Sequence, residues 1–258
     1  MRRLIINADD FGFTPDVNAG IVEAHRNGVL TSTTMMANGE AFEDAVRLAR
    51  ETPTLDIGCH LVLVQGRSLS TGALLPAGPR HLLLHLARRR IDVYKELRMQ
   101  IEKLLAAGVR PTHLDTHKHT HLVPQVFRTV VRLAREFGIS FVRLPLDRSL
   151  GIPWPIERFY RRMAEREDVR LTDHFLGFRL TGSLNEATFK AALERLPQGV
   201  TEFMCHPGKL GSELAHAETR LKESRVRELE ALTSPRIRQL INERKIELSG
   251  FDTRLDRS

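Results

Sequence analysis

The sequence predicts an α/β fold, a single (β/α) barrel of seven or eight mostly parallel strands. Short apolar segments with strand character alternate regularly with segments of helical period, which is typical of a parallel sheet. Seven or eight such units fit into the 258 residues, a length at which barrels of this kind commonly form one domain. No GxGxxG or P-loop motif marks a nucleotide-binding sheet. We therefore expect one domain over residues 1–258.

The expected strands are short apolar runs that end at turn residues or at polar clusters. The fourth strand begins a row of alternating polar residues and continues into an outgoing loop. The expected strand segments are residues 3–8, 30–37, 55–64, 111–121 with that loop, 140–145, 173–180, 200–205 and 246–249.

The expected helices have apolar residues at helical spacing and recognisable ends. Thr14 and Pro15 have the chemistry of an N-cap and a first helical position, and Gly138 is a typical stop. Residues 65–79 lack periodicity and are expected to form a surface loop that shapes a substrate groove. The expected helices are residues 15–27, 42–50, 81–107, 123–137, 156–166, 186–196, 217–232 and 236–243.

The charge balance is basic, with 39 Lys and Arg against 32 Asp and Glu and a net charge of +7. The basic clusters at residues 88–90, 158–170 and 220–245 indicate solvated helix faces, because acids at helical spacing accompany them and aromatic residues are few. No nucleic-acid recognition motif accompanies the charge, so we expect no nucleic-acid partner. Attraction to anionic lipid surfaces remains an alternative.

The composition indicates a cytoplasmic protein. No run of 18 apolar residues exists, so no transmembrane segment is expected, and Met1 leads directly into a strand-like segment without a cleavable apolar region. Two cysteines, Cys59 and Cys205, fit a reducing compartment. Strand alternation points them away from the face of their neighbours, so we expect buried thiols rather than metal ligands. The oligomeric state stays open, a homodimer included.

The most unusual stretch is residues 111–121, where five polar residues occupy every second position: His113, Asp115, His117, His119 and His121. In an extended chain they share one face, and buried imidazoles or carboxylates need a partner or a metal. At about 3.3 Å per residue the two ends lie roughly 26 Å apart, too far to share one ion. The row therefore supplies one or two ligands, and others must come from elsewhere.

Polar residues also follow other predicted strands. Asp9 and Asp10, His60, the row around His117, and His206 each lie near the carboxyl end of a strand, and in a parallel barrel these ends meet at one face. An Asp/His/His set suits a divalent metal with open positions. Taken singly, the aspartates fit an N-cap or an arginine partner, His60 a structural role, and residues 206–208 a tight turn. Their convergence favours an active site.

Four blocks of the chain resemble the YdjC family of carbohydrate deacetylases, which includes a chitooligosaccharide deacetylase and a hopanoid-biosynthesis protein. The blocks are residues 7–12, 57–61, 112–121 and 202–208. The resemblance implies a barrel related to polysaccharide deacetylases, with one divalent ion held by an Asp and two His residues.

Carried onto this sequence, the resemblance implies Asp10, His60 and His117 as metal ligands and Asp9 as catalytic base. Spacing alone does not choose His117 over the later histidines of the row. Zn²⁺ suits these ligand types, whereas the family is associated with Mg²⁺, so the ion is expected to be one of the two.

Further roles follow around these positions. We expect His206 to act as the general acid and Asp115 to orient an imidazole or that acid from the second shell. His119 and His121 are expected in the second shell or in contact with substrate. The family block often has histidine where this chain has Lys118, which is expected to face away from the row.

The expected activity is metal-dependent hydrolysis of the N-acetyl group, a linear amide, of an acetylated amino sugar of the chitooligosaccharide type, with release of acetate. An alternative is a deacetylase of an N-acetylglucosamine-bearing hopanoid glycolipid, which the basic surface and the apolar residues 82–84 would suit, although a core-facing helix start explains residues 82–84 better. A third is a non-hydrolytic metal- or sugar-binding barrel, against which the intact Asp9 and Asp10 argue.

Overall fold

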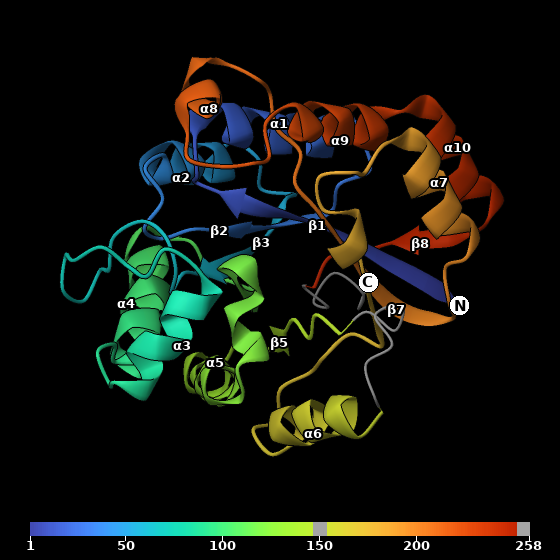
Figure 1. Cartoon of the computed structure of the whole chain (residues 1–258). Helices are drawn as coiled ribbons and strands as arrows, with labels where there is room; N and C mark the ends of the chain where they lie inside the picture. Colours follow the sequence, from blue (N-terminus) through green and yellow to red (C-terminus); the bar gives the residue numbers. More distant parts are fainter. Residues whose placement is uncertain (147–153, 252–258) are drawn as a thin grey trace.

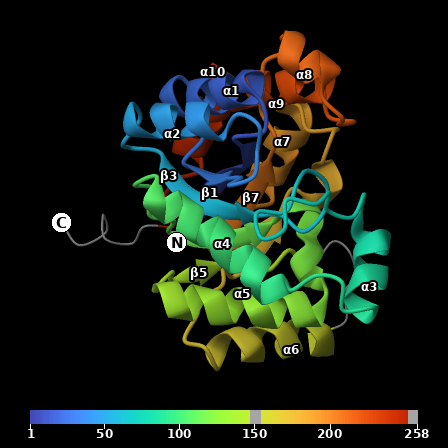
Figure 2. The same cartoon turned by 90° about the vertical axis from the view of Figure 1, so that its left-hand side faces the viewer.

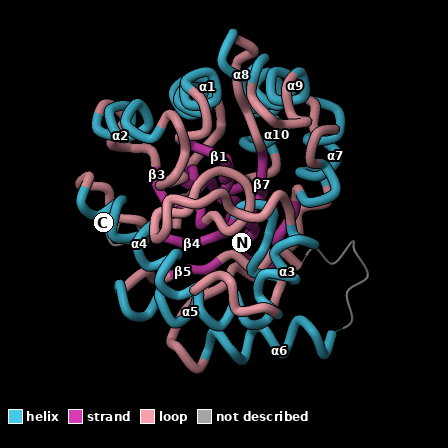
Figure 3. The backbone as a smooth tube through the Cα atoms, turned by 60° about the vertical axis from the view of Figure 1, so that its left-hand side comes forward, coloured by secondary structure: helices cyan, strands magenta, loops and turns pink. Residues whose placement is uncertain are grey.

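A sheet of parallel strands occupies the centre of the molecule, with helices on either side of it (Figures 1 and 3). The computed structural model describes residues 1–146 and 154–251. Seven strands follow the order β5-β4-β3-β2-β1-β7-β6, and β8 pairs with β1 off this path. The strands are β1 Arg2–Phe11, β2 Ser32–Met35, β3 Asp56–Leu61, β4 His113–Thr116, β5 Phe141–Val142, β6 His174–Leu176, β7 Gly199–Cys205 and β8 Ile246–Leu248.

β1 is the central strand. Its first residues pair with β8 and its last with β2 on one edge, while β7 runs along the other edge from Arg2 to Ala8. The two ends of the strand path also meet, because Phe141 on β5 forms an isolated parallel bridge to Arg170, just before β6. The sheet thus curves into a partial barrel, and the predicted α/β barrel class is confirmed.

The helices largely confirm the pattern that predicted them. Thr14 caps α1 by accepting a hydrogen bond from the Val17 amide, and α5 ends at Gly138, whose φ of 68° is left-handed. The bounds are α1 Pro15–Arg26, α2 Phe42–Arg50, α3 Pro79–Ala87, α4 Val93–Ala106, α5 Pro124–Phe137, α6 Trp154–Glu165, α7 Glu186–Glu194, α8 Ser212–His216, α9 Glu223–Thr233 and α10 Pro235–Glu243, with 3-10 turns at His117–Leu122 and Phe178–Leu180.

The predicted bounds of two helices were wrong. The single helix over 81–107 is divided into α3 and α4, because Arg89 has a left-handed φ of 51° and Asp92 caps a new helix at the Lys95 amide. The helix over 217–232 begins only at Glu223. Before it, the Thr219 hydroxyl accepts a hydrogen bond from the Leu221 amide, a local turn that competes with helical pairing.

The row of alternating polar residues is extended only as far as Thr116. Its hydroxyl accepts a hydrogen bond from the His121 amide at 3.0 Å, and the chain folds back there into a 3-10 turn. Lys118 and His119 there have left-handed φ angles of 52° and 51°. The row is therefore extended only in β4, and the common face of an extended chain does not continue into the expected outgoing loop.

The segment after β3 is fixed to α4 by a buried carboxylate. Glu96 accepts hydrogen bonds from the Ser68 hydroxyl at 2.6 Å and from the Leu69 and Ser70 amides at 3.0 Å. The loop predicted over residues 65–79 is thus held in place, and it begins at the cavity described below. Within the described residues, no helix combines the length and apolarity needed to cross a membrane.

Candidate active site

A cavity of about 530 Å³ opens at the carboxyl ends of the strands. Asp9 and Asp10 reach it from β1, His60 from β3, His117 from the turn after β4, and His206 from the segment after β7. The predicted convergence of these side chains at one face is therefore observed. His206 follows β7, which is the direct neighbour of β1, so it lies on the same side of the cavity as the aspartates.

Three side chains direct one atom each toward a common point. Asp10 Oδ1 lies 3.4 Å from His60 Nε2 and 3.2 Å from His117 Nδ1, and the two imidazole nitrogens are 3.3 Å apart. Ligand atoms at about 2.0–2.2 Å from one ion are separated by roughly 3.0–3.6 Å from each other. Asp10 Oδ1 is buried and has no hydrogen-bond partner among the described residues. The residues therefore fit a divalent cation.

Hydrogen bonds fix the orientation of each of these residues. His60 Nδ1 donates to Asp115 Oδ1 at 2.7 Å, which directs Nε2 toward Asp10. His117 Nε2 lies 3.2 Å from Gln65 Oε1, which directs Nδ1 the same way. Such outer partners orient metal-binding imidazoles in proteins generally.

Arg143 is fully buried and connects the acidic side chains beneath the point where the ligand atoms of Asp10, His60 and His117 meet. Its guanidinium binds Asp9 in a bidentate manner at 2.7 and 2.8 Å and reaches Asp115 and Glu202 at 2.6 Å each. A second group of potential ligands, Asp9, His60 and Asp115, lies here, but both of its carboxylates already contact the guanidinium. Of the two groups, Asp10, His60 and His117 therefore fit a cation better.

The charges shift several pKa values. Burial acts to raise the pKa of Asp9, but Arg143 and His60 outweigh it and hold that pKa well below its usual range. Burial likewise opposes the charge of His60, yet Asp115, Asp10 and Asp9 raise its pKa to about 10. The same carboxylates stabilise any cation at this point, so a metal ion and a proton compete for it. Burial lowers the pKa of His206 to about 4, which leaves its ring neutral near pH 7.

The remaining predicted residues have different surroundings. His206 Nε2 is 4.0 Å from Asp9 Oδ2, and within residues 1–146 and 154–251 its Nδ1 has no hydrogen-bond partner. His119 lines the cavity with its ring 5.0 Å from that of Phe178. His121 is fully buried against Phe127 and is not among the residues that line the cavity.

Lys118 lines the cavity, so the expectation that it faces away was wrong, because the left-handed turn redirects it. Cys59 and Cys205 are free and buried, as predicted.

Two arginines of the site were missed in the sequence. Arg143 was a charge within an otherwise apolar predicted strand, which is a signal for a buried ion pair. Arg225 lies on α9 and contacts Asp10 Oδ2 across 215 residues of sequence. No local pattern distinguishes it from the exposed arginines of neighbouring helices.

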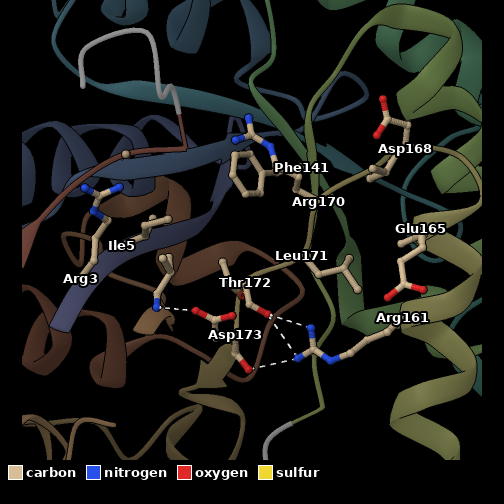
Figure 4. A pocket seen from close by; sticks show the side chains of 14 residues that line it. Arg3, Ile5, Phe141, Arg161, Glu165, Asp168, Arg170, Leu171, Thr172 and Asp173 are labelled. Atoms are coloured by element: carbon tan, nitrogen blue, oxygen red, sulfur yellow. Dashed lines mark hydrogen bonds between the residues drawn. The ribbon is translucent and has the colours of Figure 1, made fainter. Parts of the chain in front are cut away.

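A second cavity of about 570 Å³ lies at the opposite, amino-terminal ends of the strands (Figure 4). Its polar groups largely bind one another. Arg161 donates hydrogen bonds to the carbonyl oxygens of Thr172 and Asp173, and the Asp173 carboxylate accepts a hydrogen bond from the Val200 amide. No group of potential metal ligands was found there among the described residues. We therefore place the candidate site in the first cavity.

These features define a parallel α/β barrel protein with a carboxylate–imidazole centre at the carboxyl ends of its strands. The chain belongs to the family of YdjC-like proteins, whose model matches residues 3–243. Relatives from Clostridium beijerinckii, Brevibacillus brevis and Geobacillus stearothermophilus, each named carbohydrate deacetylase, are 37%, 36% and 37% identical to it. The matches cover 96%, 96% and 97% of this chain and 98%, 98% and 97% of those relatives.

Solved structures share the fold. A protein from Enterococcus faecalis, named for cellobiose-phosphate cleavage, has a TM-score of 0.83 and 29% identity, and the match covers 98% of both chains. A lactam utilization protein from Thermus thermophilus shares the fold at a TM-score of 0.53 and 15% identity, over 96% of this chain and 99% of that one.

Replacing Arg143 by Met is expected to lower the free energy of unfolding by about 3–5 kcal/mol, because three buried carboxylates lose their counter-charge. Urea unfolding at neutral pH measures it. Arg135→Met is the control, since its ion pair with Glu167 is largely exposed and contributes at most about 1 kcal/mol. Equal unfolding midpoints for the two variants would contradict the role of Arg143.

Proposed function

We propose that the protein is a metal-dependent deacetylase that hydrolyses the N-acetyl group of an acetylated amino sugar, of the chitooligosaccharide type, and releases acetate. The observation that carries the proposal is the separation of 3.2–3.4 Å among Asp10 Oδ1, His60 Nε2 and His117 Nδ1. The name shared by the relatives, carbohydrate deacetylase, supports the reaction class. The Enterococcus faecalis protein is named for a disaccharide phosphate, which supports a short saccharide.

Asp10, His60 and His117 would hold the ion, Mg²⁺ or Zn²⁺. A divalent ion there would polarise the acetyl carbonyl and make a water molecule more acidic. Asp9 accepts the proton of the attacking water, and Arg143 keeps it ionised and oriented for this role. His206, 4.0 Å from Asp9, hands a proton to the leaving amine, which departs poorly as an anion. Because its ring is neutral near pH 7, it takes up from Asp9 the proton that the attacking water gave up, and passes this proton to the amine nitrogen as the C–N bond breaks.

The cavity wall supplies groups suited to a sugar. Phe13 and Phe178 offer apolar faces, and Thr181, Lys118 and His119 offer hydrogen-bonding groups at the same cavity. Sugar rings present both apolar faces and hydroxyl groups, so this mixture fits the proposed substrate class better than a purely apolar ligand.

Acetate release from N,N′-diacetylchitobiose is expected with the purified protein. It should be lost after treatment with a chelator and restored by Mg²⁺ or Zn²⁺, and elemental analysis of protein purified without added metal should identify the ion. Release that is insensitive to chelator would refute the metal requirement. No release from any acetylated sugar in a panel would favour a non-hydrolytic binding protein.

Replacing Gln65 by Ala is expected to weaken metal binding by about 10–100-fold, because His117 loses the acceptor that directs Nδ1 toward the ion. Titration calorimetry of Zn²⁺ into metal-free protein measures this. Gln65→Glu keeps an acceptor and should retain the affinity, and Gln125→Ala, an exposed position on α5, is the control. Unchanged affinity in Gln65→Ala would show that this contact does not orient the ligand.

His206→Ala is expected to keep the metal affinity and to lose about 10²–10⁴-fold in turnover, since its ring contacts Asp9 but not the three ligand atoms. His216→Ala, on the short helix α8, is the control. Turnover at the wild-type rate in His206→Ala would remove this residue from the mechanism.

A further inference from the structure

The segment between β3 and α4 has an unusually one-sided charge. No Asp or Glu occurs from residue 57 to residue 91, a stretch that contains five arginines: Arg67, Arg80, Arg88, Arg89 and Arg90. The last four are exposed, and none of them has an ion pair with an acid of the described chain. This differs from the basic helices elsewhere, such as α6, where Arg161 pairs with Glu157.

The same segment also exposes large apolar side chains. Leu82 is fully buried, which confirms the core-facing interpretation for that residue, but Leu83 and Leu84 are 51% and 53% exposed. Leu74, in the preceding loop, is 72% exposed. At about 100° per residue, Leu83 and Leu84 fall on the outward face of α3.

Arg80 and Arg88 flank these leucines along the same helix. A surface helix normally buries its apolar residues and exposes its polar ones, so α3 presents an additional apolar face without a partner in the described structure.

We propose that residues 66–91, which we call the arm, dock the protein on an anionic lipid surface. The leucines would enter the boundary between headgroups and acyl chains while the arginines contact the lipid phosphates. A second copy of this chain fits poorly, because a twofold interface would bring the arginines of both copies together. A soluble polyanion would leave the exposed leucines in water and so fits less well.

The arm lies next to the cavity. It follows Gln65, which lines the cavity and contacts His117, and its loop is fixed to α4 by Glu96. In Figure 1 the loop that precedes α3, drawn in teal, projects to the left, the direction in which the β1 arrow points. Figure 2 looks onto that side of the molecule, and α3 lies at its right-hand edge. Docking through the arm would therefore bring the cavity close to the membrane surface and to a substrate carried by a lipid.

Co-sedimentation with vesicles tests this proposal. The protein is expected to bind vesicles of phosphatidylcholine mixed with phosphatidylglycerol, to bind pure phosphatidylcholine weakly, and to lose affinity as salt increases. The triple variant Arg88→Gln, Arg89→Gln, Arg90→Gln should lose on the order of 100-fold in affinity. Leu83→Ser with Leu84→Ser should lose about 10-fold or more.

A matched triple variant separates the arm from the net charge. Arg128→Gln, Arg166→Gln and Arg195→Gln remove the same charge from other exposed positions and should leave vesicle binding nearly unchanged. Equal loss in both triple variants, or no binding to anionic vesicles at all, would overturn the proposal. Full binding by the leucine variant, together with equal binding to soluble polyphosphate, would indicate a polyanion site instead.

Acetate release from a soluble disaccharide is measured in the same arm variants. These substitutions leave the cavity residues intact, so the release is expected to stay at the wild-type rate. Failure of vesicle binding with intact acetate release would reject the membrane inference alone. Absence of acetate release with intact vesicle binding would reject only the proposed reaction.

Discussion

The buried guanidinium of Arg143 is the interaction on which the site depends. Three carboxylates, those of Asp9, Asp115 and Glu202, point into the barrel and would repel one another without it. Buried charges are tolerated when they are paired and hydrogen-bonded, and the guanidinium fork supplies four such bonds in one plane. Because Asp115 in turn orients His60, the arginine also sets the direction of an imidazole that it does not touch.

The charges of the centre do not balance without one further cation. Four buried carboxylates, those of Asp9, Asp10, Asp115 and Glu202, face two arginines, Arg143 and Arg225. Burial raises the pKa of Glu202 to about 7, so this carboxylate is only partly ionised at neutral pH, and at least one negative charge is left over in a buried site. In the absence of metal, a proton on His60 compensates this negative charge, which is consistent with the raised pKa of that ring. Asp10 Oδ1, which accepts no hydrogen bond from the described residues, and the spacing of the ligand atoms fit a metal ion in place of that proton.

The sequence was informative where structure follows from local chemistry. Alternating periods predicted the parallel sheet, and Thr14 and Gly138 marked helix ends correctly. It failed where a single side-chain contact redirects the chain. The alternating pattern of the polar row continues past Thr116, but the Thr116 hydroxyl folds the chain back there. The helical period predicted one helix through Arg89, where the left-handed backbone ends it. Strand ends placed Asp10 and His60 together, but the family resemblance was needed to select His117, and Arg225 reaches Asp10 only through tertiary packing.

The barrel and the segment after β3 have separate roles in these proposals. Strand ends hold Asp9, Asp10 and His60 on a frame whose buried charges allow little change, so the chemistry is fixed by the sheet. The segment after β3 is held by Glu96, by Gln65 and by the buried side chains of Leu75 and Leu82, while Leu74, Leu83 and Leu84 on its outer surface are exposed. In the proposed docking, the apolar and basic outer face of this segment would bring a lipid-borne substrate to the centre without disturbing the ion pairs below. Recognition of a lipid surface can therefore arise on this barrel while the hydrolytic centre stays the same.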